Sequence, residues 1–549
     1  MLSKDKVMHG AKNIKDQETS DTPKIEIEGS FKLALELLEK TNKNLFITGK
    51  AGTGKSTLLQ YFRNTTKKNV ALLAPTGVAA LNIKGQTIHS FFGFKPDITI
   101  DSVRKLTAGK AEMYKNIDMI IIDEISMVRA DLLDCIDAFL RYNGKDSRLP
   151  FGGMRMIFIG DLYQLPPVVT YGEKKMFRQH YKSEYFFDAN AFKDFPAEFV
   201  ELDRYYRHRD ARFIKLLNAV RNNTAESDDL RALNQRLDLS FSPGASEGYI
   251  TLVPTNRLAD DLNNAALEKL RGRQHTFHAR LEGSFDERSL PAEEELDVKP
   301  DAQVMLLNND KYERWVNGSV GRITSINKEA NGTDYISVKL LDGSEVEVEK
   351  HTWEMFKMSY DPASRRLVPE VIGRFTQYPM VLAWAITIHK SQGKTFEKVI
   401  IDIGSGIFAT GQLYVALSRC RTLEGIVLKR KLEKKHIFTD WRVIRFLTRY
   451  QYAKSDERLP LQEKLRLIKE AIKAKGSIEI VYLKANDDKS RRIVTPSSVG
   501  NFEYLGKRYL GMEGFDSKRN EYRNFRVDRI LEIKIVEDLQ VPEMQRRKV

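Results

Sequence analysis

Residues 49–56 read Gly-Lys-Ala-Gly-Thr-Gly-Lys-Ser, and this stretch decides the fold that we expect for the chain. It matches G-x-x-x-x-G-K-[ST], in which Gly49 and Gly54 let the backbone curl so that its N–H groups face phosphate oxygens. Lys55 is expected to reach the β- and γ-phosphates, and the Ser56 hydroxyl to bind Mg²⁺. The residues predicted to bind nucleotide in this loop are Gly49, Ala51, Gly52, Thr53, Gly54, Lys55, Ser56 and Thr57.

The segments on either side of the loop agree with this interpretation. An apolar strand pattern at residues 45–48 precedes it and a helical pattern at 57–62 follows it. Phosphates would therefore sit at a helix N-terminus, where the helix dipole and the free N–H groups favour anions. The alternative is a chance glycine-rich turn, which does not require a strand, a loop and a helix in register. The sequence predicts a P-loop at the start of a parallel α/β sheet.

Composition limits the possible classes of protein. A chain of 549 residues is too long for a single core, so three or four domains are expected. The formal net charge of +14 favours a polyanionic partner such as nucleic acid. The two cysteines, Cys135 and Cys420, exclude a disulfide framework and a cysteine-based zinc or iron–sulfur site. With no long apolar run and no signal peptide, the sequence predicts a cytoplasmic protein.

Acids and an amide follow two further strand patterns. The run from Asp118 to Glu124 is apolar and ends in Asp123 and Glu124. We expect Asp123 to hold Mg²⁺ through water and Glu124 to orient or deprotonate the attacking water; the alternative is a strand end with solvated acids. Gln164 follows the strand pattern at 154–159, at the carboxyl end where ligands bind in open α/β sheets.

Several segments resemble the motifs of one family. They are APTGVAALNIKGQTIHSFFGF from Ala74, IIIDEISMV from Ile120, LPFGG from Leu149 and GDLYQLPPV from Gly160. This set resembles Pif-type helicases, in the 5′-to-3′ branch of superfamily one, and residues 131–153 resemble the family's signature segment. The resemblance implies a bacterial, nucleoid-associated monomer that uses ATP and Mg²⁺ to move on single-stranded DNA and to unwind duplexes and forks.

The second half of the helicase pattern begins with the strand at 198–202, which is expected to open a second doubly wound unit. By resemblance, Arg207 and Arg419 reach the γ-phosphate across a cleft, and Gly393 and Lys394 join the nucleotide site. The full set of expected catalytic residues is Lys55, Asp123, Glu124, Gln164, Arg207 and Arg419, with Ser56 and Asp123 on the metal. The expected DNA contacts in the helicase part are Thr76, His89, Asn256, Thr387, His389 and Lys390.

The predicted fold class is α/β: two RecA-like doubly wound P-loop domains, a small Src-homology-like β-barrel insert and a C-terminal β-rich WYL-like domain. The expected divisions are a disordered tail (1–24), ATPase domain 1 (25–195, with a wedge-like insert at about 93–115), domain 2 (196–299 and 361–436), the barrel (300–360), a helical linker (437–475) and the WYL-like domain (476–549).

The C-terminal region resembles a WYL domain through its β-rich pattern and the run FRVDRI from Phe525, although Arg508 stands where the name-giving Trp would be. Arginines alternate with aromatic residues here, a composition that can bind a single strand by stacking and charge, or bind a nucleotide. The alternative is a solvated face over an aromatic core. The residues expected to contact DNA are Arg508, Arg523, Arg526 and Arg529.

Two other classes of function compete with a helicase. A P-loop switch or kinase would not handle nucleic acid, and a GTPase should carry an Asn-Lys-x-Asp motif, which this sequence lacks. A DNA-independent P-loop ATPase could instead gate a WYL regulatory module. The ATPase rate with and without a short DNA single strand separates these three classes.

Overall fold

The computed structural model describes residues 27–536, apart from 194, 209, 245–246, 286–289, 329–333, 362, 365, 405, 407–408 and 505. The tail expected at residues 1–24 lies outside these described residues. In the described part, no helix is both long enough and apolar enough to span a membrane.

A six-stranded parallel sheet with the order β3-β2-β4-β5-β1-β6 carries the P-loop. Its inner strands are buried along their length, which explains why Met119–Ile122 is an uninterrupted apolar run. The elements of this unit are α1 (Gly29–Lys40), β1 (Asn44–Gly49), α2 (Lys55–Thr65), β2 (Val70–Ala74), α3 (Gly77–Asn82), β3 (Gln86–Thr87), α4 (Ile88–Phe92), α5 (Ala108–Lys115), β4 (Met119–Ile122), α6 (Ala130–Asn143), β5 (Arg155–Gly160), α7 (Tyr171–His180) and β6 (Ala197–Leu202).

Strand β6 corrects one expectation. The strand at 198–202 was expected to open the second unit, but it pairs with β1 over the whole register from Asn44↔Ala197 to Gly49↔Leu202. Val200 and Leu202 are buried in the core of the first unit. The pattern identifies a strand, whereas its partner is decided by where that apolar face is buried, which the local sequence does not show.

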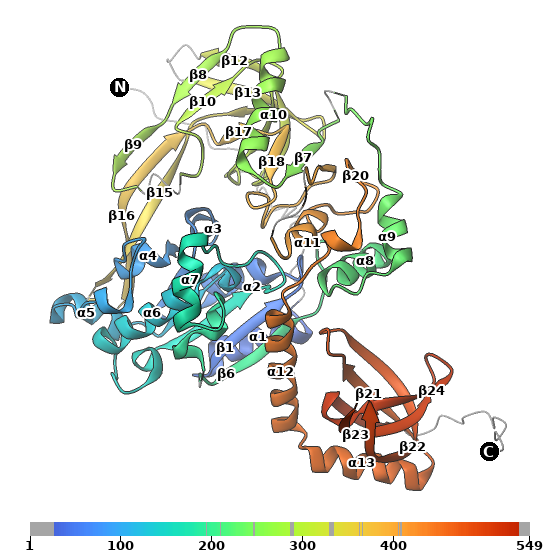
Figure 1. Ribbon diagram of the computed structural model, residues 1–549. Coiled ribbons are helices and arrows are strands. Elements are labelled where there is room, and N and C mark those ends of the chain that lie inside the picture. The colour runs from blue at the N-terminus through green and yellow to red at the C-terminus, as the bar shows by residue number, and fades with distance from the viewer. Residues whose placement is uncertain are drawn as a thin grey trace, which may run out of the picture.

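A second, four-stranded parallel sheet has the order β18-β7-β19-β20. In Figure 1 it lies above the first sheet, with α11 between the two. Its elements are α8 (Ala211–Arg221), α9 (Ser227–Asn234), β7 (Ile250–Val253), α10 (Asn256–Lys269), β18 (Ala385–Thr387), β19 (Val399–Ile401), α11 (Gln412–Leu417) and β20 (Ile426–Leu428).

Antiparallel strands interrupt this second unit between α10 and β18. They extend beyond the expected 300–360 on both sides: β17 joins the sheet of β11 to β14, β9 and β16 form a sheet with β15, and β8 and β10 pair with each other. The strands are β8 (His275–His278), β9 (Arg280–Gly283), β10 (Glu295–Val298), β11 (Gln303–Leu306), β12 (Val320–Lys328), β13 (Asp334–Leu340), β14 (Glu345–Val348), β15 (His351–Asp361), β16 (Arg366–Gln377) and β17 (Met380–Leu382).

At the junction back to the second sheet, one apolar run at residues 381–386 is divided between two sheets. Val381 pairs with Met305 in the antiparallel sheet, and Ile386 pairs with Leu252 in the parallel one. The apolar run is continuous because both halves are buried, although in different sheets.

The hairpin of β15 and β16 descends from the antiparallel region to the edge of the first sheet (Figure 1). The Met358 N–H donates to Gln86 Oε1 at 3.1 Å, and the Leu367 N–H donates to Asn69 Oδ1 at 3.2 Å. Beside it lies the segment at 93–115 that was expected to be a wedge; in its helix α5, Tyr114 is buried against the ring of Phe139 at 4.9 Å.

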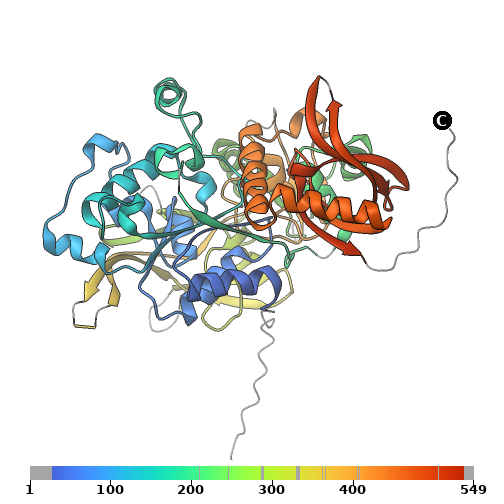
Figure 2. The same ribbon diagram turned by 90° about the horizontal axis from the view of Figure 1, so that it is seen from below.

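The C-terminal region consists of two helices and an antiparallel sheet with the order β24-β23-β22-β21-β25. Seen from below, it lies at one side of the molecule with α13 across one face of the sheet (Figure 2). Helix α12 joins it to the body, where Phe446 stacks on Phe187 at 4.4 Å. The elements are α12 (Trp441–Arg458), α13 (Leu461–Ala474), β21 (Ser477–Leu483), β22 (Lys489–Tyr504), β23 (Lys507–Asp516), β24 (Glu521–Arg526) and β25 (Ile530–Val536). The prediction of a parallel α/β core followed by a β-rich C-terminal region is confirmed.

Candidate nucleotide and DNA sites

The P-loop connects β1 to α2 with two glycines in left-handed conformation, Gly52 (φ +79°) and Gly54 (φ +85°). A Cβ at Gly52 would lie 2.6 Å from the Cβ of Arg207, so a larger residue would clash there. The Gly52 carbonyl accepts the N–H of Tyr206 at 2.8 Å. The segment after β6 therefore lies directly on the P-loop, an arrangement that brings Arg207 to the nucleotide site.

Lys55 is the lysine of this loop that is expected to reach the phosphates. Its Nζ donates to the carbonyl oxygens of Gly49 (2.7 Å) and Lys50 (3.2 Å), within the curl of the loop. Burial lowers its pKa, while the nearby carboxylates, among them Asp161 and Glu124, act to raise it. Ser56 and Thr57 follow it in the exposed first turn of α2. Lys55, Ser56 and Thr57 thus belong to the N-terminal turn of α2, whose free N–H groups favour an anion.

The two acids expected to act on water end strand β4. The Asp123 carboxylate accepts the N–H of Glu124 at 2.9 Å, and Glu124 has a left-handed backbone (φ +49°). Burial and the neighbouring Asp123 raise the pKa of Glu124 to about 7, and burial also raises the pKa of Asp123. A carboxylate with a raised pKa is better matched to accepting a proton than an ordinary surface acid.

Gln392 connects these groups to the second sheet. Its amide donates to Glu124 Oε2 at 3.2 Å and to Gln164 Oε1 at 3.1 Å. Gln164 is buried and donates in turn to Asp161 Oδ2 at 3.4 Å. The sequence assigned no role to Gln392; its place in the loop after β18, at the carboxyl end of a parallel strand, was the signal that could have identified it.

The two predicted arginines meet in the same cleft. Arg207 donates to the carbonyl oxygens of Ser418 (3.4 Å) and Gly393 (3.3 Å). Arg419 is 1% exposed and donates to the Val415 carbonyl at 2.9 Å and to Ser418 Oγ at 2.7 Å. Burial lowers the pKa of both guanidinium groups.

Neither arginine forms an ion pair with an acid of the described residues. Two guanidinium groups are thus held by neutral carbonyls in a partly dry cleft, which favours an anionic ligand such as phosphate.

Tyr414 on α11 contacts the P-loop directly. Its hydroxyl accepts the N–H of Ala51 at 2.8 Å and donates to Asp161 Oδ2 at 3.2 Å. The helix that carries Arg419 at its end is therefore fixed against the loop that carries Lys55. Gly393 (φ +81°) lies in the cleft, whereas the Lys394 ammonium bonds Asn317 Oδ1 at 2.5 Å in the antiparallel region.

The residues expected to contact DNA in the helicase part lie at two kinds of position. Thr76 follows β2, whereas Thr387 is the last residue of β18 and is 3% exposed; each accepts an N–H three residues ahead, at 3.3 Å and 3.2 Å. Asn256 and Lys390 are exposed, and His89 and His389 are partly buried. The segments after β2 and β18, at the carboxyl ends of parallel strands, thus carry Thr76, His389 and Lys390.

The four C-terminal arginines are not gathered on one surface. Arg526 pairs with Gly511 across β23 and β24, and Arg523 pairs with Gly514, so the odd spacing places their side chains on opposite faces. Arg526 lies 5.4 Å from the centre of the Tyr509 ring. Arg508 lies 3.9 Å from Glu503. Arg529 lies in the short 3₁₀ turn that follows β24.

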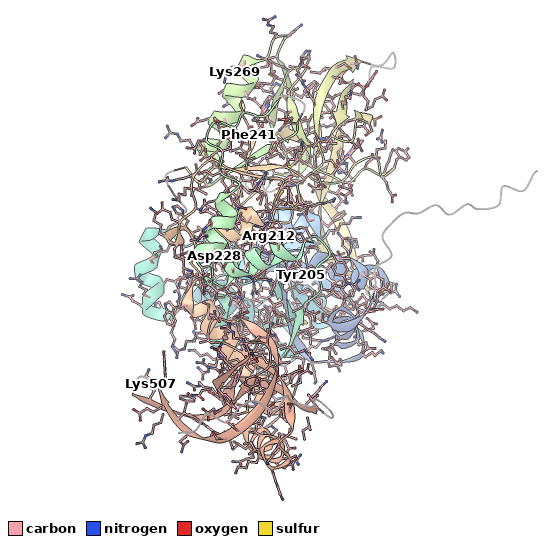
Figure 3. All side chains as sticks on the ribbon, turned by 90° about the vertical axis from the view of Figure 1, so that its right-hand side faces the viewer. Tyr205, Arg212, Asp228, Phe241, Lys269 and Lys507 are labelled. Atoms are coloured by element: carbon pink, nitrogen blue, oxygen red, sulfur yellow. The ribbon has the colours of Figure 1, made fainter. Side chains whose placement is uncertain are left out.

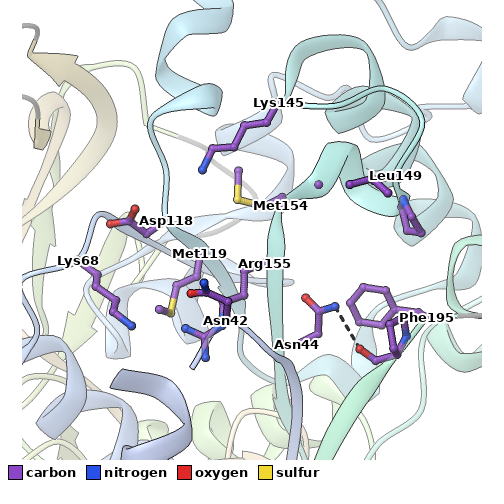
Figure 4. A pocket seen from close by; sticks show the side chains of 13 residues that line it. Asn42, Asn44, Lys68, Asp118, Met119, Lys145, Leu149, Met154, Arg155 and Phe195 are labelled. Atoms are coloured by element: carbon purple, nitrogen blue, oxygen red, sulfur yellow. Dashed lines mark hydrogen bonds between the residues drawn. The ribbon is translucent and has the colours of Figure 1, made fainter. Parts of the chain in front are cut away.

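A cavity of about 600 Å³ lies at the amino ends of the strands of the first sheet, opposite the P-loop (Figure 4). Asn44 and Arg155, at the amino ends of β1 and β5, line it together with Lys68. The Arg155 guanidinium donates to the Leu37 and Leu38 carbonyls, so these cations cap the C-terminus of α1. This cavity is distinct from the nucleotide site.

Ser56 and Asp123 offer a hydroxyl and a carboxylate, oxygen donors that Mg²⁺ accepts. The described residues contain no group of three or more His, Cys, Asp or Glu side chains that could hold a metal alone. The donor set fits Mg²⁺, which binds through one or two protein groups together with phosphate and water.

Comparison with known proteins identifies two matching families. A model described as PIF1-like helicase matches residues 27–230, and a WYL domain model matches 463–535. The chain is 31% identical over 438 residues to the ATP-dependent DNA helicase Pif1 of Bdellovibrio bacteriovorus, covering 78% of this chain and 93% of that one. It is 34% identical to human PIF1, with 70% of this chain and 58% of that one covered.

Solved structures give the same result. Unliganded Pif1 from Bacteroides sp. is 37% identical, with a TM-score of 0.70 and coverage of 77% of this chain and 97% of that one. Bacteroides Pif1 bound to single-stranded DNA is 36% identical with the same coverages, but its TM-score is 0.57. The arrangement of this chain is therefore more similar to the DNA-free relative.

Proposed function

The chain belongs to the Pif1-like helicases, and from this we infer that the protein is an ATP-dependent DNA helicase. One observation of the structure supports this most directly: Gln392 of one parallel sheet bridges Glu124 and Gln164 of the other, in the cleft that also holds the P-loop and Arg419. A cleft completed from two sheets can couple nucleotide turnover to movement between them.

We assign the motor to two domains. Domain 1 runs from residue 27 through β6, and domain 2 comprises α8 to α10 together with β18 to β20. The antiparallel strands β8 to β17 are the insert; the sheet β14-β13-β12-β11-β17 within them is the Src-homology-like barrel. The segment at 93–115 is the strand-splitting wedge. We propose that the protein acts as a monomer and moves 5′ to 3′.

The nucleotide chemistry follows from the positions of the site residues. Lys55 and the P-loop N–H groups hold the β- and γ-phosphates, and Glu124 accepts a proton from the water that Gln164 helps to orient. Arg207 and Arg419 stabilise the charge of the transferring phosphoryl group. Ser56 and Asp123 hold Mg²⁺, which when bound neutralises the phosphate charge.

The DNA strand runs across the carboxyl ends of both sheets. Each domain binds the strand with its own residues. Domain 1 contributes Thr76 and His89, and domain 2 contributes Asn256, Thr387, His389 and Lys390. Hydroxyl, amide and ammonium groups suit backbone phosphates. The lower TM-score to the DNA-bound Bacteroides structure supports a rearrangement of the domains when DNA binds.

One experiment tests this function against the alternatives. The ATPase rate of the full chain should rise about tenfold or more when a short oligo-dT is added, since DNA aligns the cleft. Strand displacement of a fork should require ATP, and Lys55→Ala should lack both activities because the phosphate-binding cation is removed. Robust turnover that ignores oligo-dT would favour the DNA-independent gating ATPase instead.

The C-terminal sheet offers a second surface for a single strand. On the face opposite α13, Tyr509 stacks with Phe502 at 6.0 Å, Arg526 lies over Tyr509, and Phe515 packs against Tyr522 at 5.5 Å. Figure 3 shows the end of this sheet, marked by Lys507, standing out from the body. Aromatic rings beside a guanidinium can stack bases and neutralise phosphates. Of the four predicted arginines, Arg526 therefore has the surroundings best suited to DNA.

Arg526→Glu should weaken oligo-dT binding and reduce the slope of log K against log salt by about one, because one phosphate contact is lost. Arg523→Glu is the matched control: its side chain is 38% exposed against 39% for Arg526, and each pairs with a nearby acid, but it lies on the other face. Fluorescence anisotropy over a salt series measures the effect. Equal losses in the two variants would argue against a face-specific DNA contact.

A further inference from the structure

The turn between β21 and β22 places Asp487, an acid of the C-terminal region, against the two parallel-sheet units. Asp487 has a left-handed backbone (φ +61°) and is 8% exposed. Its carboxylate accepts the hydroxyl of Tyr163 at 2.9 Å and the amide of Gln451 at 2.8 Å. Tyr163 follows β5 in domain 1, so the C-terminal sheet contacts the body next to Gln164, one of the residues at the nucleotide site.

One buried arginine joins Asp487 to a second acid. Arg221, at the end of α8, is 3% exposed; it lies 3.8 Å from Asp487 Oδ2 and donates to Asp161 Oδ1 at 3.4 Å. Its guanidinium also lies 3.8 Å from the centre of the Tyr163 ring. A single positive charge is thus shared between two carboxylates out of water. Loss of either carboxylate changes the position of the guanidinium relative to the other.

The second acid, Asp161, contacts two residues of the candidate nucleotide site. It is fully buried and accepts the Tyr414 hydroxyl at 3.2 Å and the Gln164 amide at 3.4 Å. Tyr414 in turn accepts the P-loop N–H of Ala51 at 2.8 Å. Polar contacts therefore run without a break from the C-terminal turn to the P-loop and to Gln164.

A neighbouring contact fixes the turn from the other side. Lys489, the first residue of β22, forms an ion pair with Glu201. Glu201 lies on β6 and pairs in register with Thr48 of β1, at the base of the P-loop. The turn and the start of β22 are thus attached to the segment after β5 and to β6, the neighbour of the strand before the P-loop.

We propose that Asp487 is a positioning residue for ATP hydrolysis, through which the C-terminal domain sets the turnover number of the motor. Acting through Arg221 and Tyr163, it holds Asp161, and Asp161 holds Gln164 and Tyr414 where the cleft needs them. The inference rests on the proposed helicase function. It concerns kcat and is separate from the DNA-binding role proposed for the outer face of the same sheet.

The test uses the full-length protein with saturating oligo-dT. Asp487→Asn removes the charge but keeps the shape and tolerates the left-handed backbone, and Tyr163→Phe removes only the hydroxyl. Each should lower kcat by about tenfold with KM for ATP nearly unchanged, a size typical of coupling through a buried network. The double variant should be little worse than the stronger single one, because both act on one path. Oligo-dT affinity should not change.

Asp488→Asn is the control, since this neighbouring acid of the same turn is half-exposed and its ion pair among the described residues is with Lys484, at 2.6 Å. Thermal unfolding shows whether a variant with low turnover is still folded. If Asp487→Asn does not fold, kcat of Tyr163→Phe tests the positioning role. Folded variants with wild-type kcat, or with an effect confined to KM, would overturn the positioning role. A wild-type protein that ignores oligo-dT would instead overturn the proposed function.

Discussion

Arg419→Ala is expected to lower kcat for ATP hydrolysis by about 10³- to 10⁵-fold, the typical contribution of an arginine that reaches the transferring phosphoryl group. The side chain is already fixed by the Val415 carbonyl and the Ser418 hydroxyl, so little reorganisation is needed when phosphate arrives. It has no carboxylate partner among the described residues, which leaves its charge available to the nucleotide. The measurement is kcat at saturating ATP and oligo-dT.

Two variants make this result specific. Arg419→Lys should recover little activity, because a point charge lacks the planar fork of a guanidinium. Arg421→Ala is the control, since Arg421 is close in sequence but exposed and pairs with Glu397 at 2.7 Å. Oligo-dT affinity of the Arg419 variants should stay near wild type. A parallel loss of DNA affinity at low salt would instead place this arginine at the DNA site, and Arg207→Ala can be judged by the same criteria.

Glu124→Gln should keep ATP and DNA binding but lower kcat by about 10²- to 10⁴-fold, the usual contribution of a general base. The substitution preserves the shape of the side chain, and its amide oxygen can still accept the Gln392 N–H that now bonds Glu124 at 3.2 Å. What disappears is the capacity to take a proton from water. Single-turnover hydrolysis of pre-bound ATP measures the chemical step without product release.

Glu173→Gln is the control, because it makes the same substitution outside the cleft. Glu173 lies on α7 and forms an ion pair with Arg129 at 2.7 Å. Its kcat should match that of the wild type. Hydrolysis by Glu124→Gln at the rate of the Glu173 control would show that another group activates the water.

The sequence signals for the P-loop half of the candidate site are local. A strand, a loop and a helix in register fix the positions of Gly54, Lys55 and Ser56, and a buried apolar strand ending in two acids fixes Asp123 and Glu124. Arg207 and Arg419 were assigned to the site from the resemblance to helicase motifs, because no local pattern distinguishes them from surface arginines.

What the sequence missed depends on long-range contacts. Gln392 meets Glu124 only because two sheets face each other, and β6 joins the first sheet only because its apolar face is buried there. Asp487 looks like an ordinary turn acid between two strands, and its burial depends on the docking of a whole domain. In each case the deciding interaction joins residues far apart in the chain, which pattern and spacing do not report.

The pairing of β7 with β18, in which Thr251 lies opposite Ala385, has a consequence for biosynthesis. The strands of the first sheet, ending at Leu202, leave the ribosome early and can pair at once, whereas β7 must wait for the entire antiparallel insert to be synthesised before its neighbour exists. Until then the apolar edge of β7 is exposed to other chains. A chain paused before Ala385 would carry the complete P-loop but not Arg419.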